Sequence, residues 1–185
     1  MPPIDLERLL QRLNDPCRRA LEAAAGRTLS RTHYNVEIEH WLLQLVDADT
    51  PDISLLLHHY KIDTGRLTAE LNRVLDRMAT GNGRAPGLAP ELVVVIKQAW
   101  LLGSVEREEA HVRSGHLLWA MLADETIGAR LRATLPALRT VAADSVRADF
   151  SRVLADSPEA ENVIPAASPA ATAQKAACWI STRKI

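Results

Sequence analysis

Six histidines are the residues of this sequence whose type suits metal binding or acid–base chemistry. His58 and His59 are adjacent, so they cannot share one face of a helix. His40 and His116 occupy matching places in two similar stretches, each near the start of an expected helix. Neither His-x3-His nor Cys-x2-Cys occurs, so the spacing offers no zinc ligand set. The sequence therefore predicts no metal site, and histidines that cap helices or lie partly buried.

Nucleophilic catalysis would need a serine or cysteine beside a base. The nearest combination, Ser-Gly-His at 114–116, is typical of a helix start, and no Gly-x-Ser-x-Gly is present. Three glutamates within 106–109 indicate a solvated helix end rather than a pair of catalytic carboxylates. The glycine run at 81–84 lacks the Lys-Ser/Thr that completes a phosphate-binding loop. We expect no enzyme activity and no cofactor in this chain.

Composition and charge limit the partner and the compartment. The 185 residues are 47% apolar, enough for a well-buried domain, and carry a net charge of −1. Basic residues are scattered among acidic ones, which argues against nucleic acid as a partner. Cys17 and Cys178 form no disulfide framework, which favours a reducing compartment. No apolar run approaches the roughly 18 residues of a membrane span, and no signal peptide is evident. We expect a soluble, cytoplasmic protein without a membrane partner.

One stretch of the chain occurs twice. Residues 36–46 read VEIEHWLLQLV, and residues 112–122 read VRSGHLLWAML. Val36 matches Val112 and His40 matches His116, so the offset between the copies is 76 residues. A repeat of this length indicates one structural unit used twice.

The elements around the two copies are predicted to be helices. Ala, Leu, Arg and Glu dominate, and apolar residues recur every three or four positions. Asp15 is the expected cap of one helix, and Ser114 of another. The expected helices cover about 4–13, 16–29, 38–48, 53–60 and 115–123, with others beginning near 63 and 90. Trp41, Trp100 and Trp119 lie on apolar stripes and are expected in the core. The fold class is all-α.

Glycine and proline divide the chain into units. Residues 80–90 hold three Gly and two Pro, so a linker is predicted between repeat 1 (about 16–79) and repeat 2 (about 90–155). Residues 158–174 are rich in Ala, Pro, Ser and Thr, which is typical of a flexible linker. The prediction is a domain at 1–157, followed by a flexible linker and a non-native tail at 158–185.

Two tandem four-helix units with these helix starts resemble the amino-terminal domain of Clp-type AAA+ unfoldases. An additional leading helix (LERLLQRLN at 6–14) and the HYNVEIEHW segment at 33–41 resemble the ClpV branch, the ATPase of bacterial type VI secretion. The resemblance covers residues 4–157. It implies a pseudo-two-fold fold with an extra amino-terminal helix. It also implies a hexameric full-length ATPase whose isolated domain is monomeric.

The resemblance implies a partner as well. In that family the domain recognises an amino-terminal helix of the larger sheath subunit, so that contracted sheath is captured and disassembled. An apolar groove beside the leading helix suits such a helix. The contact residues expected in this sequence are Leu9, Leu13, Ala20, Ala24, Leu88 and Leu92. The alternative for this surface is that the leading helix merely closes the core.

A second function is also compatible with the resemblance. The chain could be the adaptor- or substrate-binding domain of a general Clp protein-quality unfoldase. The leading helix discriminates between the two, because general unfoldases of this type usually lack it.

Overall fold

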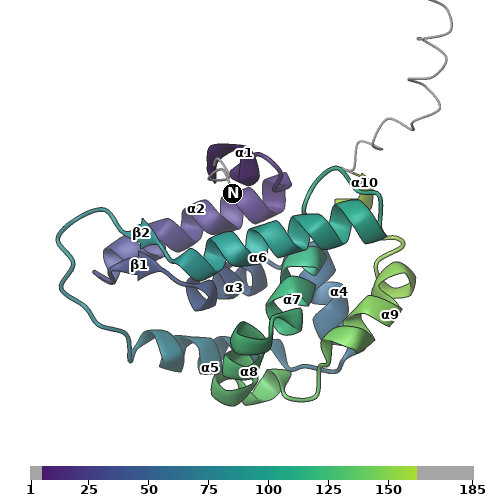
Figure 1. The fold of residues 1–185 in the computed structure, drawn as a ribbon. Helices are drawn as coiled ribbons and strands as arrows, with labels where there is room; N and C mark the ends of the chain where they lie inside the picture. The colour runs from purple at the N-terminus through teal and green to yellow at the C-terminus, as the bar shows by residue number, and fades with distance from the viewer. Residues whose placement is uncertain (1–5, 162–185) are drawn as a thin grey trace, which may run out of the picture.

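Helices make up nearly all of the regular structure in the computed structural model, which describes residues 6–161 (Figure 1). The predicted tail, including Cys178, lies outside these residues. A leading helix precedes four helices of the first repeat. Their bounds are α1 (Leu6–Leu10), α2 (Asp15–Ser30), α3 (Ile38–Asp47), α4 (Pro51–His59) and α5 (Thr64–Leu75).

The second repeat has the same order of helices. Its elements are α6 (Pro90–Leu101), a π-helical turn η1 (Leu102–Glu106), α7 (Ser114–Ala123), α8 (Glu125–Thr134), a 3-10 turn η2 (Pro136–Leu138) and α9 (Ala143–Val153), followed by α10 (Pro158–Glu161). Both ends of α3 and α7 differ by 76 residues, the offset of the sequence repeat. The all-α prediction, with two four-helix units and an extra leading helix, is confirmed.

A short parallel ladder joins the segment between α2 and α3 of the first repeat to the start of the second repeat. β1 (Asn35–Val36) pairs with β2 (Gly87–Leu88). The backbone N–H of Asn82 also donates to the carbonyl of Thr32 at 2.9 Å. The 80–90 break, predicted only as a linker, is therefore tied to the end of α2, and it fixes where α6 begins.

The core lies around α3 and α7, which are buried along almost their whole length. α2 packs on α3 and α6 packs on α7, while α4 bridges to α7. Trp41 and Trp119 are buried as predicted. The prediction for Trp100 is wrong: 37% of this side chain is exposed, and the guanidinium of Arg12 lies 5.6 Å from the centre of its ring. Trp100 lies at the edge of the apolar stripe of α6, where the stripe meets solvent.

Two predicted caps are displaced by one residue. The cap of α2 is Asn14, whose side chain accepts from the N–H of Cys17 at 3.0 Å, and Asp15 is the first helical residue. The cap position of α7 is Arg113, and Ser114 begins the helix. The short polar residues Asp15 and Ser114 therefore predicted the N-termini of α2 and α7 to within one residue.

None of the described helices is both long and apolar enough to cross a membrane.

Candidate functional site

The six predicted contact residues lie on α1, the turn between α1 and α2, α2, β2 and α6, and most of them are covered. Leu9, Leu13, Ala20, Ala24 and Leu92 are each at most 4% exposed, and Leu88 is half-buried. All six belong to, or pack against, one core cluster. Five of the six are thus already in contact with the protein's own side chains, and they lie beneath the surface that a partner would meet.

The small side chains of α2 show why the burial was missed. A stripe of alanines predicts that another helix approaches closely, and that helix is α3 of the same chain. The indole N–H of Trp41 donates to the carbonyl of Cys17 at 3.1 Å. The fully buried Ala24 is therefore covered by the protein's own helices, while Ala20 borders a cleft between α2, the end of α3 and the start of α4. A glutamate at Ala24 would place a charge in the core, where an unpaired carboxylate is strongly unfavourable.

Exposed or half-buried apolar residues remain on these same elements. Leu10, Ala25, Leu88 and Val93 pack against the core cluster with part of their surface open. Leu6 is 37% exposed and Leu29 53%. We call these six residues the α1/α2/α6 face. α1 contacts α6, and Figure 1 shows α1 at the outer side of the helices on which the face lies.

Opposite flanks of α2 lead to different surfaces. The guanidinium of Arg18 donates to the carbonyl of Leu13 at 3.2 Å, so the Arg18 flank faces the turn that joins α1 to α2. At about 100° per residue, Ala25 and Leu29 lie on that flank, while Ala23 lies about 160° from Ala25. The Ala23 flank instead lines a cleft of about 400 Å³ between α2, the end of α3 and the start of α4. Residues two apart on one helix therefore sample two separate surfaces.

Basic residues border the α1/α2/α6 face. Arg12 and Arg18 are exposed at the corner between α1 and α2, and Lys97 is half-buried on α6. The nearest carboxylate to Arg18 is that of Asp15, 3.9 Å away and largely exposed. This corner favours acidic groups on a partner, although exposed charges influence orientation more than affinity.

The two repeat-related histidines cap helices, as the sequence predicted. The N–H of Glu37 donates to Nδ1 of His40 at 3.1 Å, and the N–H of Arg113 donates to Nδ1 of His116 at 3.2 Å. Both rings must be neutral with the proton on Nε2. Burial lowers the pKa of His40 to about 4 and the pKa of His116 to about 3.

The second nitrogens of these rings differ: Nε2 of His40 makes a hydrogen bond, whereas Nε2 of His116 makes none. Nε2 of His40 lies 2.8 Å from Nδ1 of His33, to which it donates. Nε2 of His116 lies 3.6 Å from a carboxylate oxygen of Glu109, and burial raises the pKa of Glu109. Within residues 6–161, no group of three or more His, Cys, Asp or Glu side chains is arranged to hold a metal ion.

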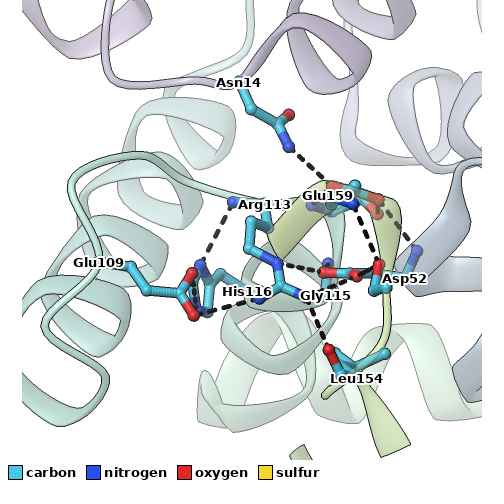
Figure 2. A network of polar contacts seen from close by, with 10 residues as sticks. Asn14, Asp52, Glu109, Arg113, Gly115, His116, Leu154 and Glu159 are labelled. Carbon is cyan, nitrogen blue, oxygen red and sulfur yellow. Dashed lines mark hydrogen bonds and ion pairs between the residues drawn. The ribbon is translucent and has the colours of Figure 1, made fainter. Parts of the chain in front are cut away.

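A buried ion pair joins the two repeats, and sequence reasoning missed it. The guanidinium of Arg113 donates to both oxygens of Asp52 at 2.9 and 2.8 Å (Figure 2). Burial raises the pKa of Asp52, and the hydrogen bonds from Arg113 oppose that shift. Glu109 accepts from the same guanidinium at 3.1 Å. The only sign of this pair in the sequence was a charged residue, Arg113, at the cap position of α7. Nothing in the sequence indicated that its partner is Asp52 on α4.

Comparisons with known proteins agree with the fold of two helical repeats. The sequence model of the Clp repeat (R) N-terminal domain family matches residues 12–135. The chain belongs to this family. It is 26% identical over 166 residues to the chaperone protein ClpB of Yersinia enterocolitica, a match covering 90% of this chain and 19% of that protein. It is 25% identical over 159 residues to the AAA+ ATPase ClpV1 of Pseudomonas aeruginosa, covering 86% and 18%. The chain thus spans about a fifth of the length of these curated relatives.

Among solved structures, the chain is more similar to ClpV N-domains than to the N-terminal domain of Hsp104. The N-domain of ClpV from Vibrio cholerae is 29% identical, covers 84% of this Clp repeat domain and 93% of that chain, and superimposes with a TM-score of 0.74. A complex of a ClpV N-domain with a VipB peptide is 27% identical, covers 84% and 95%, and has a TM-score of 0.71. The Hsp104 N-terminal domain of Candida albicans, at 13% identity and a TM-score of 0.60 over 75% and 89% of the two chains, shares only the fold. The predicted likeness to ClpV N-terminal domains is confirmed.

Proposed function

We propose that this domain recognises the sheath of a type VI secretion system. It binds an amino-terminal helix of the larger sheath subunit, so that contracted sheath is captured for ATP-driven disassembly. The full-length protein is then a hexameric, cytoplasmic ATPase, and this domain supplies binding rather than catalysis. The observation that carries the proposal is the likeness to a ClpV N-domain that holds a VipB peptide.

The leading helix supports this branch over a general unfoldase. α1 is present, and its Leu9 is buried in the common core, so the helix is an integral part of the domain. The match to ClpB supports the alternative of a general protein-quality domain. The chain is 26% identical to ClpB and 25% identical to ClpV1, so sequence identity does not favour either. A domain of that kind would bind unrelated unfolded segments as well as the sheath helix.

The proposed contact surface is the α1/α2/α6 face. A helix bound there would place apolar residues at i, i+3, i+4 and i+7 against the open parts of Leu10, Ala25 and Val93. Of the predicted residues, Leu88 belongs to this face, and Leu9, Leu13 and Leu92 are buried in the core on or next to the same elements. Ala24 is also buried, whereas Ala20 lines the separate cleft on the Ala23 flank. Acidic residues of the partner would lie near Arg12 and Arg18. A modest apolar surface of this kind is consistent with micromolar affinity, about −8 kcal/mol.

Fluorescence anisotropy of a labelled sheath helix tests the proposal. Ala25→Glu puts a carboxylate onto the face and should weaken binding at least tenfold. Ala23→Glu makes the same change two residues earlier, on the cleft flank, and is the matched control with affinity within twofold of the unmodified domain. An Ala25→Glu variant that binds normally removes this face. Equal affinity for an unrelated unfolded peptide would favour the general-unfoldase alternative.

A further inference from the structure

The last described helix, α10, is held by one buried carboxylate. α10 has four residues, which is too short to be stable by itself. Its Glu159 is nevertheless only 1% exposed. The packed structure therefore continues past 157, the boundary predicted from composition.

Four donors surround the Glu159 carboxylate. One oxygen accepts from the side-chain amide of Asn14 and from the N–H of Ser114, both at 2.8 Å. The other accepts from the N–H of Asp52 at 3.0 Å and from the hydroxyl of Ser114. Asp52 lies in the first turn of α4, and Ser114 is the first residue of α7. The carboxylate thus sits at two helix N-termini, where unpaired N–H groups and the helix dipoles favour an anion (Figure 2).

A second contact fixes the approach to α10. The hydroxyl of Ser157 donates to Asp52, and the guanidinium of Arg113 donates to the carbonyl of Leu154 at 3.3 Å. Both contacts are polar, and no apolar residue of α10 belongs to the core cluster. The hydrophobic core is therefore complete without α10, so its detachment removes hydrogen bonds and little apolar burial.

We infer that α10 is a latch: Glu159 docks its carboxylate into a site formed by the N-termini of α4 and α7, and its release frees residues 155–161 from the bundle. These seven residues, fully extended, would span up to about 25 Å. Asn14 belongs to the same site and caps α2, so the latch also contacts the helix that carries Ala25 and Leu29. The inference stands on these contacts alone and does not depend on the proposed function.

Amide hydrogen exchange on the full 185-residue chain tests the latch. The N–H groups of Asp52 and Ser114 donate to Glu159, so their exchange rates report its docking. Glu159→Gln removes the negative charge that the two helix N-termini favour and turns an NH2 group toward their N–H donors. The latch should therefore open, and both amides should exchange at least tenfold faster. Amides in the middle of α3 should be unchanged. Glu22→Gln, on the exposed side of α2, is the control and should alter neither rate.

Three results would overturn the inference. These are unchanged exchange at Asp52 and Ser114, equal acceleration throughout the domain, or failure of Glu159→Gln to fold, because a latch must open without unfolding the bundle. A second variant tests the ligand class. In Glu159→Ala, 100 mM acetate should restore protection of the two amides, whereas chloride at equal ionic strength should not. Absence of that difference would contradict a carboxylate site.

Discussion

The buried pair of Arg113 and Asp52 leads to an asymmetric prediction about stability. Arg113 is 4% exposed at its side chain and Asp52 is fully buried. The guanidinium is bound by two carboxylates, those of Asp52 and Glu109, and the carboxylate of Glu159 lies in the same polar network (Figure 2). Removal of the cation leaves the buried Asp52 and the part-buried Glu109 without their shared partner, with the buried Glu159 close by. Removal of Asp52 leaves the cation paired with Glu109.

The magnitudes follow from that difference. Truncating one partner of a buried pair typically costs 3–5 kcal/mol. We expect Arg113→Ala to lower the free energy of unfolding by about 5 kcal/mol, the upper end of this range. Asp52→Ala should lower it by about 3 kcal/mol, the lower end. The double variant should cost clearly less than the sum, because neither charge is then left alone. For comparison, Asp76→Ala breaks an exposed pair with Arg31 and should cost less than about 1 kcal/mol.

Urea unfolding followed by circular dichroism measures these differences, with the slope of each transition checked for change. Single variants that cost under about 1 kcal/mol would show that the pair is not buried as described. An Asp52→Ala cost equal to or above that of Arg113→Ala would refute the reasoning about excess negative charge.

Further predictions concern the caps, a close contact and the buried thiol. His40 and His116 are neutral in the fold down to a pKa of about 4 and about 3, while the unfolded chain takes up protons below about 6.5, so they make stability fall as pH decreases through that window. Urea melts of His116→Gln at pH 7 and pH 5 should show a smaller loss than the unmodified domain; an equal loss would contradict this assignment. Gly115→Ala should destabilise the domain by about 1–3 kcal/mol, because the added carbon would lie 2.8 Å from Asp52 and 2.7 Å from Leu154; an unchanged urea midpoint would contradict it. Burial raises the pKa of the Cys17 thiol well above its usual value, so this residue should resist thiol reagents until urea unfolds the domain; rapid modification of the native protein would contradict its burial.

The sequence was informative wherever one element defines its own geometry. Apolar periodicity and the 76-residue repeat placed α3 and α7 nearly to the residue. The repeat also identified His40 and His116 as equivalent capping residues, because an equal position in two equal units implies an equal partner. These features depend on local spacing, which the chain displays directly.

The predicted site depended on what covers each helix, and local spacing does not contain that information. The alanines of α2 indicated close approach but not the approaching element, which is α3 with Trp41. Glu159 resembled a linker residue by composition, and its burial arises from partners more than 40 positions away. One sequence does not reveal contacts between residues so far apart. The burial of the predicted contact residues and the docking of Glu159 are therefore evident only from the three-dimensional structure.

The most direct test of the proposed function is a map of backbone amide NMR shifts on titration with the sheath helix. The account predicts the largest changes at Leu10, Ala25 and Val93, with little change at Ala23 and Ala48 in the cleft between α2 and α3. Shifts concentrated at Ala23 and Ala48, with those at Leu10, Ala25 and Val93 unmoved, would contradict it.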